Sequence, residues 1–346
     1  MSKILTVFGA TGIQGSSVIR AVQADPVLSK AFRIRAITRD PTKPSAQTLA
    51  QQGIEVTAAD MGSPSSLAAA LKGTHTLFLV TLPDMVTGAA RGTETEHGKN
   101  AADAAKGAGV QHVVFSSLIN VTEASQGKLP HVAHFDSKAA VEAYMRSQGI
   151  PATFIQPGYY MTNFTNLGLL PKGEDGSYTL AGPTGADKAK LPLFFADDDT
   201  GELPSSSGPP NFVYPQIKLD RPKETNRTMH ALHLGKYFVA VARNPDKTLG
   251  KQIHAAADYY TPTRIVDEFS AVTGHKSQYV QLDHGVYKGF LPPPIAQEIL
   301  ENELLCEDPG FFAGGSLSEG HELLAEAGLA VTTWKEFLER NKVRFA

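Results

Sequence analysis

Three glycines near the start of the chain form the pattern with the clearest chemistry. Gly9, Gly12 and Gly15 occur in Gly-Ala-Thr-Gly-Ile-Gln-Gly, between a β-rich apolar segment and a segment with helical periodicity. Glycine lets the backbone turn tightly and approach an anion closely, and the N–H groups that begin a helix attract phosphate. The pattern predicts a dinucleotide pyrophosphate loop; the alternative is a turn that only packs strand against helix. The expected ligands in this loop are Gly9, Thr11, Gly12, Ile13 and Gln14.

The residues after the second predicted strand bear on which dinucleotide binds. An acidic side chain there would hydrogen-bond the ribose 2′-hydroxyl of NAD. The chain instead has Arg39 and Lys43, and a guanidinium can hold a 2′-phosphate with two parallel bonds. Asp40 lies between them and is expected to point elsewhere. We therefore predict NADP(H) as the cofactor; the alternative is that Arg39 is a solvated surface residue.

Alternating strands and helices in the first half of the chain are expected to position these residues. Strands are predicted at 4–8, 32–38, 53–58, 74–80, 110–116 and 152–156, with helices at 12–24, 65–71, 94–107 and 134–147. Such βαβ repetition favours an α/β fold with a doubly wound parallel sheet of the Rossmann type. We expect a dinucleotide-binding domain over 1–157 and a smaller C-terminal α/β lobe over 158–346.

The same topology nominates further cofactor contacts, because ligands bind beyond the carboxyl ends of parallel strands. Asp60 is expected near the adenine, 81–83 near the adenosine and pyrophosphate, and 157–160 near the nicotinamide. A tyrosine in the last segment could stack on the nicotinamide or wall the pocket, and a serine after the fifth strand could instead cap a turn. The residues nominated in this way are Asp60, Met61, Thr81, Leu82, Pro83, Ser116, Lys138, Pro157, Gly158, Tyr159 and Tyr160.

A segment rich in Pro, Gly, Ser, Asp and Lys interrupts the second half of the chain near 185–227. It contains two apolar patches, at 191–195 and 212–214. We expect a loop-rich insertion whose patches dock as a lid over the nicotinamide site; an inert surface insertion is the alternative. Beyond it, helices are predicted at 229–242, 262–273, 295–303 and 333–341, and strands at 252–256 and 277–282.

Composition argues against several other classes of protein. The net charge is −3 over 346 residues, so we expect no direct binding of nucleic acid. No apolar segment is long enough to span a bilayer, and the first apolar run is too short for a signal peptide. Cys306 is the single cysteine and cannot form an internal disulfide, and no set of metal ligands is visible. We expect a protein of the cytoplasm, or of the cytoplasm and nucleus.

Four segments together resemble a known family. They are GATGIQG at 9–15, TRDPTK at 38–43, HFDSK at 134–138 and GIPATFIQPGYYMTNF at 149–164. In this combination the chain resembles the NmrA-like proteins, atypical members of the short-chain dehydrogenase/reductase superfamily. The resemblance extends to about residue 165 and returns at 243–256. It implies a Rossmann fold, NADP binding and, in many members, a regulatory role exerted through protein partners.

Typical enzymes of that superfamily pair a tyrosine with a lysine four residues later, on one helical face. This chain has Lys138, but His134 stands where the tyrosine would be. The resemblance implies that Lys138 holds the nicotinamide ribose or acts catalytically, as in isoflavone-reductase-like relatives that also lack the tyrosine. Histidine exchanges protons near neutral pH, so His134 is a second catalytic candidate; the alternative is a packed structural histidine.

Two functions follow from these residues. The favoured hypothesis is an NmrA-like NADP(H)-binding protein that acts as a redox-sensitive regulator, in which the cofactor shifts the second lobe toward a regulatory protein partner. The alternative is an NADPH-dependent reductase of a small carbonyl or quinone-like substrate that uses Lys138.

Overall fold

A computed structural model describes residues 2–83, 90–195 and 233–345 of the chain. Its main feature is a seven-stranded sheet in the order β10-β6-β5-β4-β1-β2-β3, and every neighbouring pair is parallel. This confirms the expected α/β class and doubly wound sheet. The strands are β1 (Lys3–Val7), β2 (Phe32–Thr38), β3 (Glu55–Ala58), β4 (Thr74–Leu79), β5 (His112–Ser116), β6 (Ala152–Pro157) and β10 (Gln252–Ala255).

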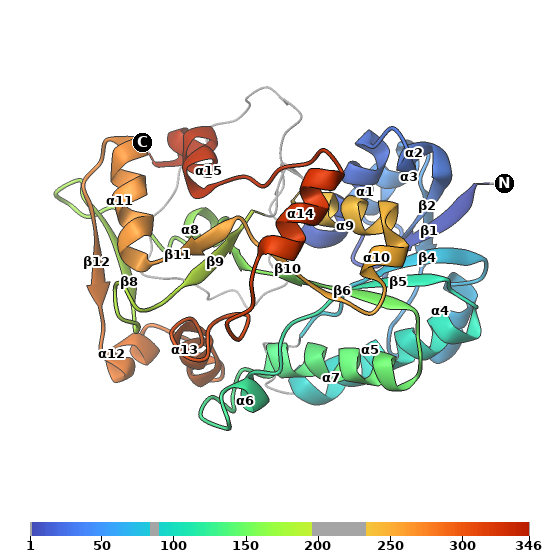
Figure 1. The fold of residues 1–346 in the computed structure, drawn as a ribbon, viewed down its shortest axis with the longest axis horizontal. Helices are drawn as coiled ribbons and strands as arrows, with labels where there is room; N and C mark the ends of the chain where they lie inside the picture. The colour runs from blue at the N-terminus through green and yellow to red at the C-terminus, as the bar shows by residue number, and fades with distance from the viewer. Residues whose placement is uncertain (1, 84–89, 196–232, 346) are drawn as a thin grey trace.

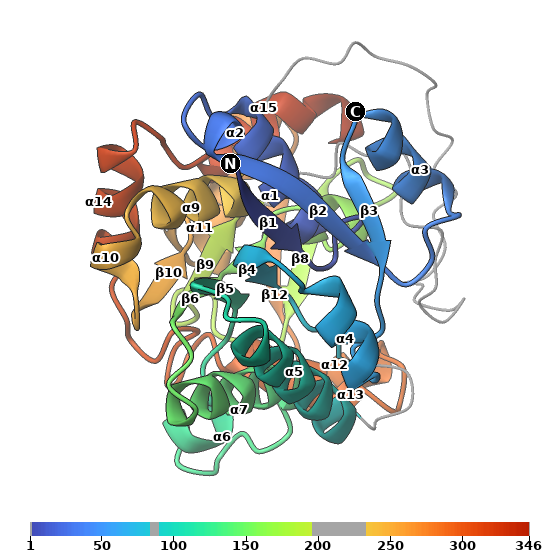
Figure 2. The same cartoon turned by 90° about the vertical axis from the view of Figure 1, so that its right-hand side faces the viewer.

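Helices cover both faces of this sheet, which is why its central strands are buried at nearly every position. One face is covered by α1 (Ile13–Ala24), α9 (His233–Arg243) and α14 (Ser318–Glu326). The other is covered by α4 (Pro64–Ala70), α5 (Ala90–Gly107) and α7 (Ala133–Ser147), as Figure 2 shows. The strand order reverses between β1 and β4, so ligands are expected at the carboxyl ends of these two strands.

The C-terminal lobe lies beside the sheet (Figure 1) and contains two small sheets around its own core. Buried aromatic residues from distant segments, including Phe164, Phe269 and Trp334, fill that core. The strands of the first small sheet are β7 (Tyr159–Tyr160), β9 (Leu191–Phe194) and β11 (Asp258–Tyr260), and those of the second are β8 (Tyr178–Gly182) and β12 (Ser277–Gln281). The helices of this lobe are α8 (Asn163–Asn166), α11 (Pro262–Thr273), α12 (His284–Gly289), α13 (Ala296–Leu304) and α15 (Trp334–Asn341).

The remaining helices are short connections or cover the edges of the main sheet. They are α2 (Leu28–Ala31), α3 (Pro44–Gln51), α6 (Val121–Ala124), α10 (Pro245–Thr248) and the 3₁₀ helix η1 (Lys342–Phe345). No helix among the described residues is long and apolar enough to cross a membrane.

The structure differs from the expected boundary at residue 157. β10 pairs in parallel with β6, and α9 packs against α1, so 233–255 returns to the main sheet. β10 is far in sequence from β6, and the local sequence of an edge strand does not indicate which sheet it joins. Residues on both sides of position 157 therefore contribute strands to the main sheet.

The expected lid also needs correction where it is described. Leu191, Leu193 and Phe194 lie in β9, the central strand of the β11-β9-β7 sheet, and are buried in the protein core. They therefore belong to the core of the C-terminal lobe and do not form a lid. β9 is short and contains Pro192, so its sequence carries little β signal. The patch at 212–214 lies outside the described residues.

Candidate functional site

The glycine loop between β1 and α1 has the backbone geometry of a phosphate cradle. Gly9 has φ of +63°, a left-handed conformation that side-chain-bearing residues rarely adopt. A Cβ on Gly15 would lie 2.2 Å from the carbonyl oxygen of Gly9, so only glycine fits there. Gly12 is the N-cap of α1 and supplies no side-chain acceptor, which leaves N–H groups of the first turn open to an anion. The loop thus fits a dinucleotide pyrophosphate.

Tyr160 is joined to this loop. Gln14 donates from Nε2 to the Tyr160 hydroxyl at 2.6 Å, whereas Oε1 of Gln14 is buried without a partner among the described residues. Burial raises the pKa of Tyr160 to about 12, so the phenol stays protonated. Tyr160, expected near the nicotinamide, thus lies beside the glycine loop, with its hydroxyl held by Gln14.

The basic residues after β2 are exposed at the same edge. The Asp40 carboxylate accepts hydrogen bonds from the Thr42 hydroxyl at 2.6 Å and its N–H at 2.9 Å. These bonds hold the pKa of Asp40 below its usual value. Asp40 is turned into its own loop, which leaves the exposed Arg39 and Lys43 to meet an incoming 2′-phosphate.

Lys138 lies at the centre of a buried polar network. Its ammonium donates to the carbonyl oxygen and the hydroxyl of Thr81, at 2.8 and 2.9 Å, and to the carboxylate of Glu94. The Thr81 hydroxyl and Ser137 also donate to Glu94, whose side chain is fully buried. Desolvation lowers the pKa of Lys138, and the neighbouring Glu94 opposes that shift. All three ammonium protons thus have acceptors within the protein.

The other residues nominated by topology lie at the carboxyl edge in different environments. The exposed Asp60 accepts a bond from the Gly62 N–H at 2.9 Å, and Met61 is partly buried against the core below it. Leu82 is exposed, and Pro83 is partly exposed next to it. The Ser116 hydroxyl is buried and has no hydrogen-bond partner among the described residues.

Pro157 and Gly158 are buried where β6 leads into the C-terminal lobe. A Cβ on Gly158 would lie 2.1 Å from the carbonyl oxygen of Pro192, so this glycine is needed for the close approach of β9. Tyr159 and Tyr160 follow as neighbours in β7 and therefore point to opposite faces. Tyr160 faces the glycine loop, whereas Tyr159 points into the lobe.

His134 is engaged by the C-terminal lobe. Its Nδ1 lies 2.6 Å from Oε1 of Glu298 on α13, and the same oxygen accepts from the His134 backbone N–H at 3.0 Å. His131 makes an equivalent pair with Glu301. Two carboxylates of α13 thus bind the start of α7, an arrangement that serves lobe docking. No group of three metal-ligating side chains occurs among the described residues.

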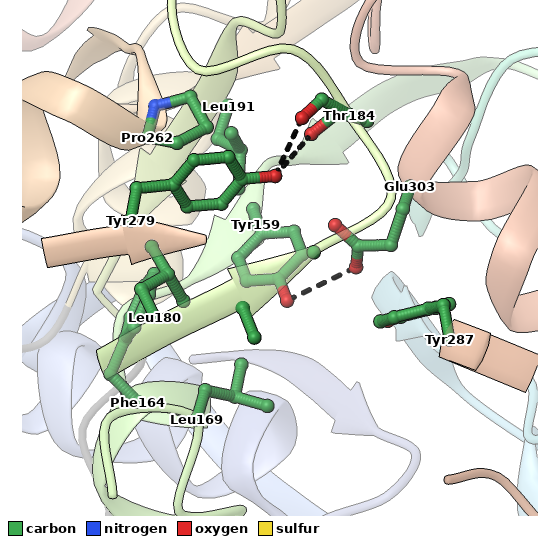
Figure 3. Close-up of a pocket in the computed structure, with 12 residues that line it drawn as sticks. Tyr159, Phe164, Leu169, Leu180, Thr184, Leu191, Pro262, Tyr279, Tyr287 and Glu303 are labelled. Carbon is green, nitrogen blue, oxygen red and sulfur yellow. Dashed lines mark hydrogen bonds between the residues drawn. The ribbon is translucent and has the colours of Figure 1, made fainter. Parts of the chain in front are cut away.

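A second pocket lies within the C-terminal lobe, on the Tyr159 face of β7 (Figure 3). Its walls are mainly apolar and aromatic, with the carboxyl of Glu303 from α13 among them. The Tyr159 hydroxyl lies 3.3 Å from Oε1 of Glu303, and the Tyr279 hydroxyl bonds Thr184 at the far wall. Desolvation raises the pKa of Glu303 to about 7. The pocket therefore holds a carboxyl that is a weak acid near neutral pH.

Comparison with known proteins shows which family has this architecture. The profile of the NmrA-like family matches residues 1–205 and 214–338. The chain belongs to the NmrA-like family. The NmrA-like family domain-containing oxidoreductase malD of Malbranchea aurantiaca is 31% identical over 291 residues, which cover 81% of this chain and 76% of that protein. The resemblance seen in the four sequence segments is thereby confirmed.

Solved structures similar to this NmrA-like protein include a regulator and a reductase. NmrA, a negative transcriptional regulator, matches with a TM-score of 0.72 and 19% identity over 98% of this chain and 95% of that one. The Citrobacter sp. triphenylmethane reductase, complexed with NADP(H), matches with a TM-score of 0.70 and 22% identity over 98% and 99%. At these identities the likeness establishes the shared Rossmann-type fold.

Sequence reasoning missed two carboxylates of these sites, Glu94 and Glu303. Glu94 lies in the second turn of α5, the helix after β4, and an acidic residue there could have been considered as a partner for Lys138. Glu303 lies in a helix with several other glutamates, and nothing in its spacing separates it from them. Only its position in the fold distinguishes it.

Proposed function

We propose that this NmrA-like protein is an NADP(H)-dependent oxidoreductase that reduces a small conjugated carbonyl or quinone-like compound. The single observation that carries the proposal is the position of Lys138: its ammonium is bonded to Thr81, directly after β4 and beside the glycine loop after β1. Although it is paired with Glu94, a buried ammonium there is a hydrogen-bond donor where negative charge develops in a reduction. Bound NADPH would supply the hydride.

NADP(H) as the cofactor is supported by the residues that would hold it. The glycine loop leaves room for a pyrophosphate, and the exposed Arg39 and Lys43 suit the charge of a 2′-phosphate. NmrA and the triphenylmethane reductase have the same fold, and the latter was solved with NADP(H). The oxidoreductase assignment is further supported by the description of the Malbranchea relative as an oxidoreductase.

A redox-sensitive regulator is the second candidate, and one observation favours it. The Lys138 ammonium already has three acceptors within the protein, so it can bind a nicotinamide ribose only by giving up one of them. The similar fold of NmrA, a transcriptional regulator, agrees with a function exerted through a protein partner. Such a regulator would work in the cytoplasm or the nucleus.

NADPH oxidation against a panel of conjugated ketones and quinones separates the two functions. We expect at least one compound to be turned over at an ordinary enzymatic rate, on the order of 10 per second. Lys138→Met should lower that rate by about 100-fold, because it removes the charge at the reaction edge. NADPH titration of the variant shows that the cofactor still binds. Tight NADPH binding with no turnover of any compound would favour the regulator.

A further inference from the structure

The pocket in the C-terminal lobe has the composition of a small-molecule site. Ligand pockets are mainly apolar, with a few polar groups that orient the ligand. Tyr159, Phe164, Tyr279 and Tyr287 provide flat aromatic walls around the carboxyl of Glu303, which faces Tyr159 across the pocket (Figure 3). Walls of this kind favour a flat ligand that carries one polar group.

Glu303, which is half-buried, differs from the buried carboxylates in having no cationic partner among the described residues. Glu94 pairs with Lys138, Glu142 with Arg146 and Asp25 with Arg243. Among the described residues, the carboxyl of Glu303 has one hydrogen bond, from the Tyr159 hydroxyl, and no ion pair. A partly desolvated carboxyl without a counter-charge favours its protonated form, which can donate to a carbonyl oxygen.

The position of the pocket relates it to the predicted cofactor site. Tyr159 follows the buried Gly158 at the carboxyl end of β6, the edge at which a parallel sheet binds its ligands. Its neighbour Tyr160 is bonded to Gln14 of the glycine loop, so one short strand contributes to both places. The cavity volume of the pocket is about 30 Å³, which limits the part of a ligand held there to a small group.

We propose that this pocket holds the carbonyl end of a small, flat conjugated ketone through the Tyr159–Glu303 pair, and that the Glu303 carboxyl protonates its oxygen during reduction. The inference rests on the proposed reductase function. The hydride of NADPH adds to the conjugated system, the π-electron pair moves to the ketone oxygen, and that oxygen takes the Glu303 proton. NADP⁺ and a carboxylate remain, and the carboxylate regains its proton from water.

Binding can be measured without turnover, because the chain has one tryptophan next to the pocket. The ring centroid of Trp334 lies 4.8 Å from that of Phe164, which lines the pocket. We expect 2-cyclohexen-1-one, added in the presence of NADP⁺, to change Trp334 fluorescence in a saturable manner. Leu169→Phe, which fills the pocket, should abolish the response, and Glu326→Gln on the exposed surface should not change it. An equal saturable response in Leu169→Phe, or none in the wild type, would overturn the proposed binding site.

Turnover then tests the role of Glu303. Glu303→Gln keeps the shape and a hydrogen-bond donor but has no acidic proton, so KM should change by less than about 3-fold while kcat falls about 100-fold. Wild-type kcat should decline as pH rises through about 7, where the carboxyl loses its proton, and this limb should be missing in the variant. Wild-type kcat in a folded Glu303→Gln protein would refute the proton donor. Absence of NADPH oxidation in the wild type would count against the reductase, while the fluorescence response would still decide the pocket.

Discussion

Two carboxylates, Glu94 at the edge of the main sheet and Glu303 in the C-terminal lobe, are withdrawn from water in opposite ways. Glu94 is enclosed by donors: the Lys138 ammonium, the Thr81 hydroxyl and the Ser137 hydroxyl. Glu303 has mainly apolar and aromatic walls and accepts one hydrogen bond, from Tyr159, and the pKa of its carboxyl is raised to about 7. A glutamate side chain therefore takes part in a charged network at Glu94 and is a weak acid in a pocket at Glu303.

The difference follows from the surroundings that each region provides. The sheet edge collects cations, with Lys138 buried and Arg39 and Lys43 exposed, as suits a site for an anionic dinucleotide. Among the described residues, no cation lines the pocket around Glu303. This contrast predicts that charge substitutions act differently in the two regions.

The largest effect is expected when the Glu94–Lys138 pair is broken. Glu94→Gln leaves the buried ammonium without its counter-charge, and removing one partner of a buried pair costs about 3–5 kcal/mol of unfolding free energy. Urea unfolding measures the loss. Glu96→Gln, on the exposed side of the same helix, is the matched control and should change stability by less than about 0.5 kcal/mol. A variant as stable as the wild type would mean that the pair does not hold the sheet edge together.

A smaller effect is expected at the exposed cations of that edge. Arg39→Glu replaces a 2′-phosphate donor by a repelling charge, which should weaken NADPH binding by about 1.5–3 kcal/mol, or about 10- to 100-fold. NADH, which lacks the 2′-phosphate, should lose much less affinity. Calorimetric titration of both cofactors measures the difference, with the exposed Arg33→Glu on β2 as the control. Equal affinities of the wild type for NADPH and NADH would contradict the predicted preference.

The smallest effect is a pH dependence of stability that belongs to Glu303. Because its pKa is raised to about 7 in the folded protein, the native state binds more protons than the unfolded state between about pH 5 and 7. The unfolding free energy should therefore fall with rising pH in this window, by on the order of 2 kcal/mol. Glu303→Gln should remove the decline and be the more stable protein at pH 8.

Thermal unfolding at pH 5 and pH 8 tests this dependence, with Glu326→Gln as a surface control. An identical decline in wild type and Glu303→Gln would assign the slope to other groups and would remove the contrast with Glu94.

Much of the sheet and the glycine loop could be predicted from sequence, because their determinants are local. β2 (Phe32–Thr38) and α11 (Pro262–Thr273) have the expected bounds, since side-chain periodicity follows directly from the geometry of strand and helix. β9, by contrast, lies in the segment for which the sequence predicts a loop. Its four residues include a proline, and it is held as a strand by pairing with β7 and β11.

The sequence alone determined the glycine loop, the alternation of strands and helices and the basic segment after β2, because each depends on residues close together in the chain. Tertiary structure alone decided the state of the buried polar groups. Lys138 meets Glu94 across 44 residues, and Tyr159 meets Glu303 across 144. Whether a carboxyl lies beside an ammonium or an apolar wall depends on which segments, distant in sequence, pack next to it. The physical reason is that desolvation and Coulomb energy depend on distances between groups in space and not on their separation in sequence.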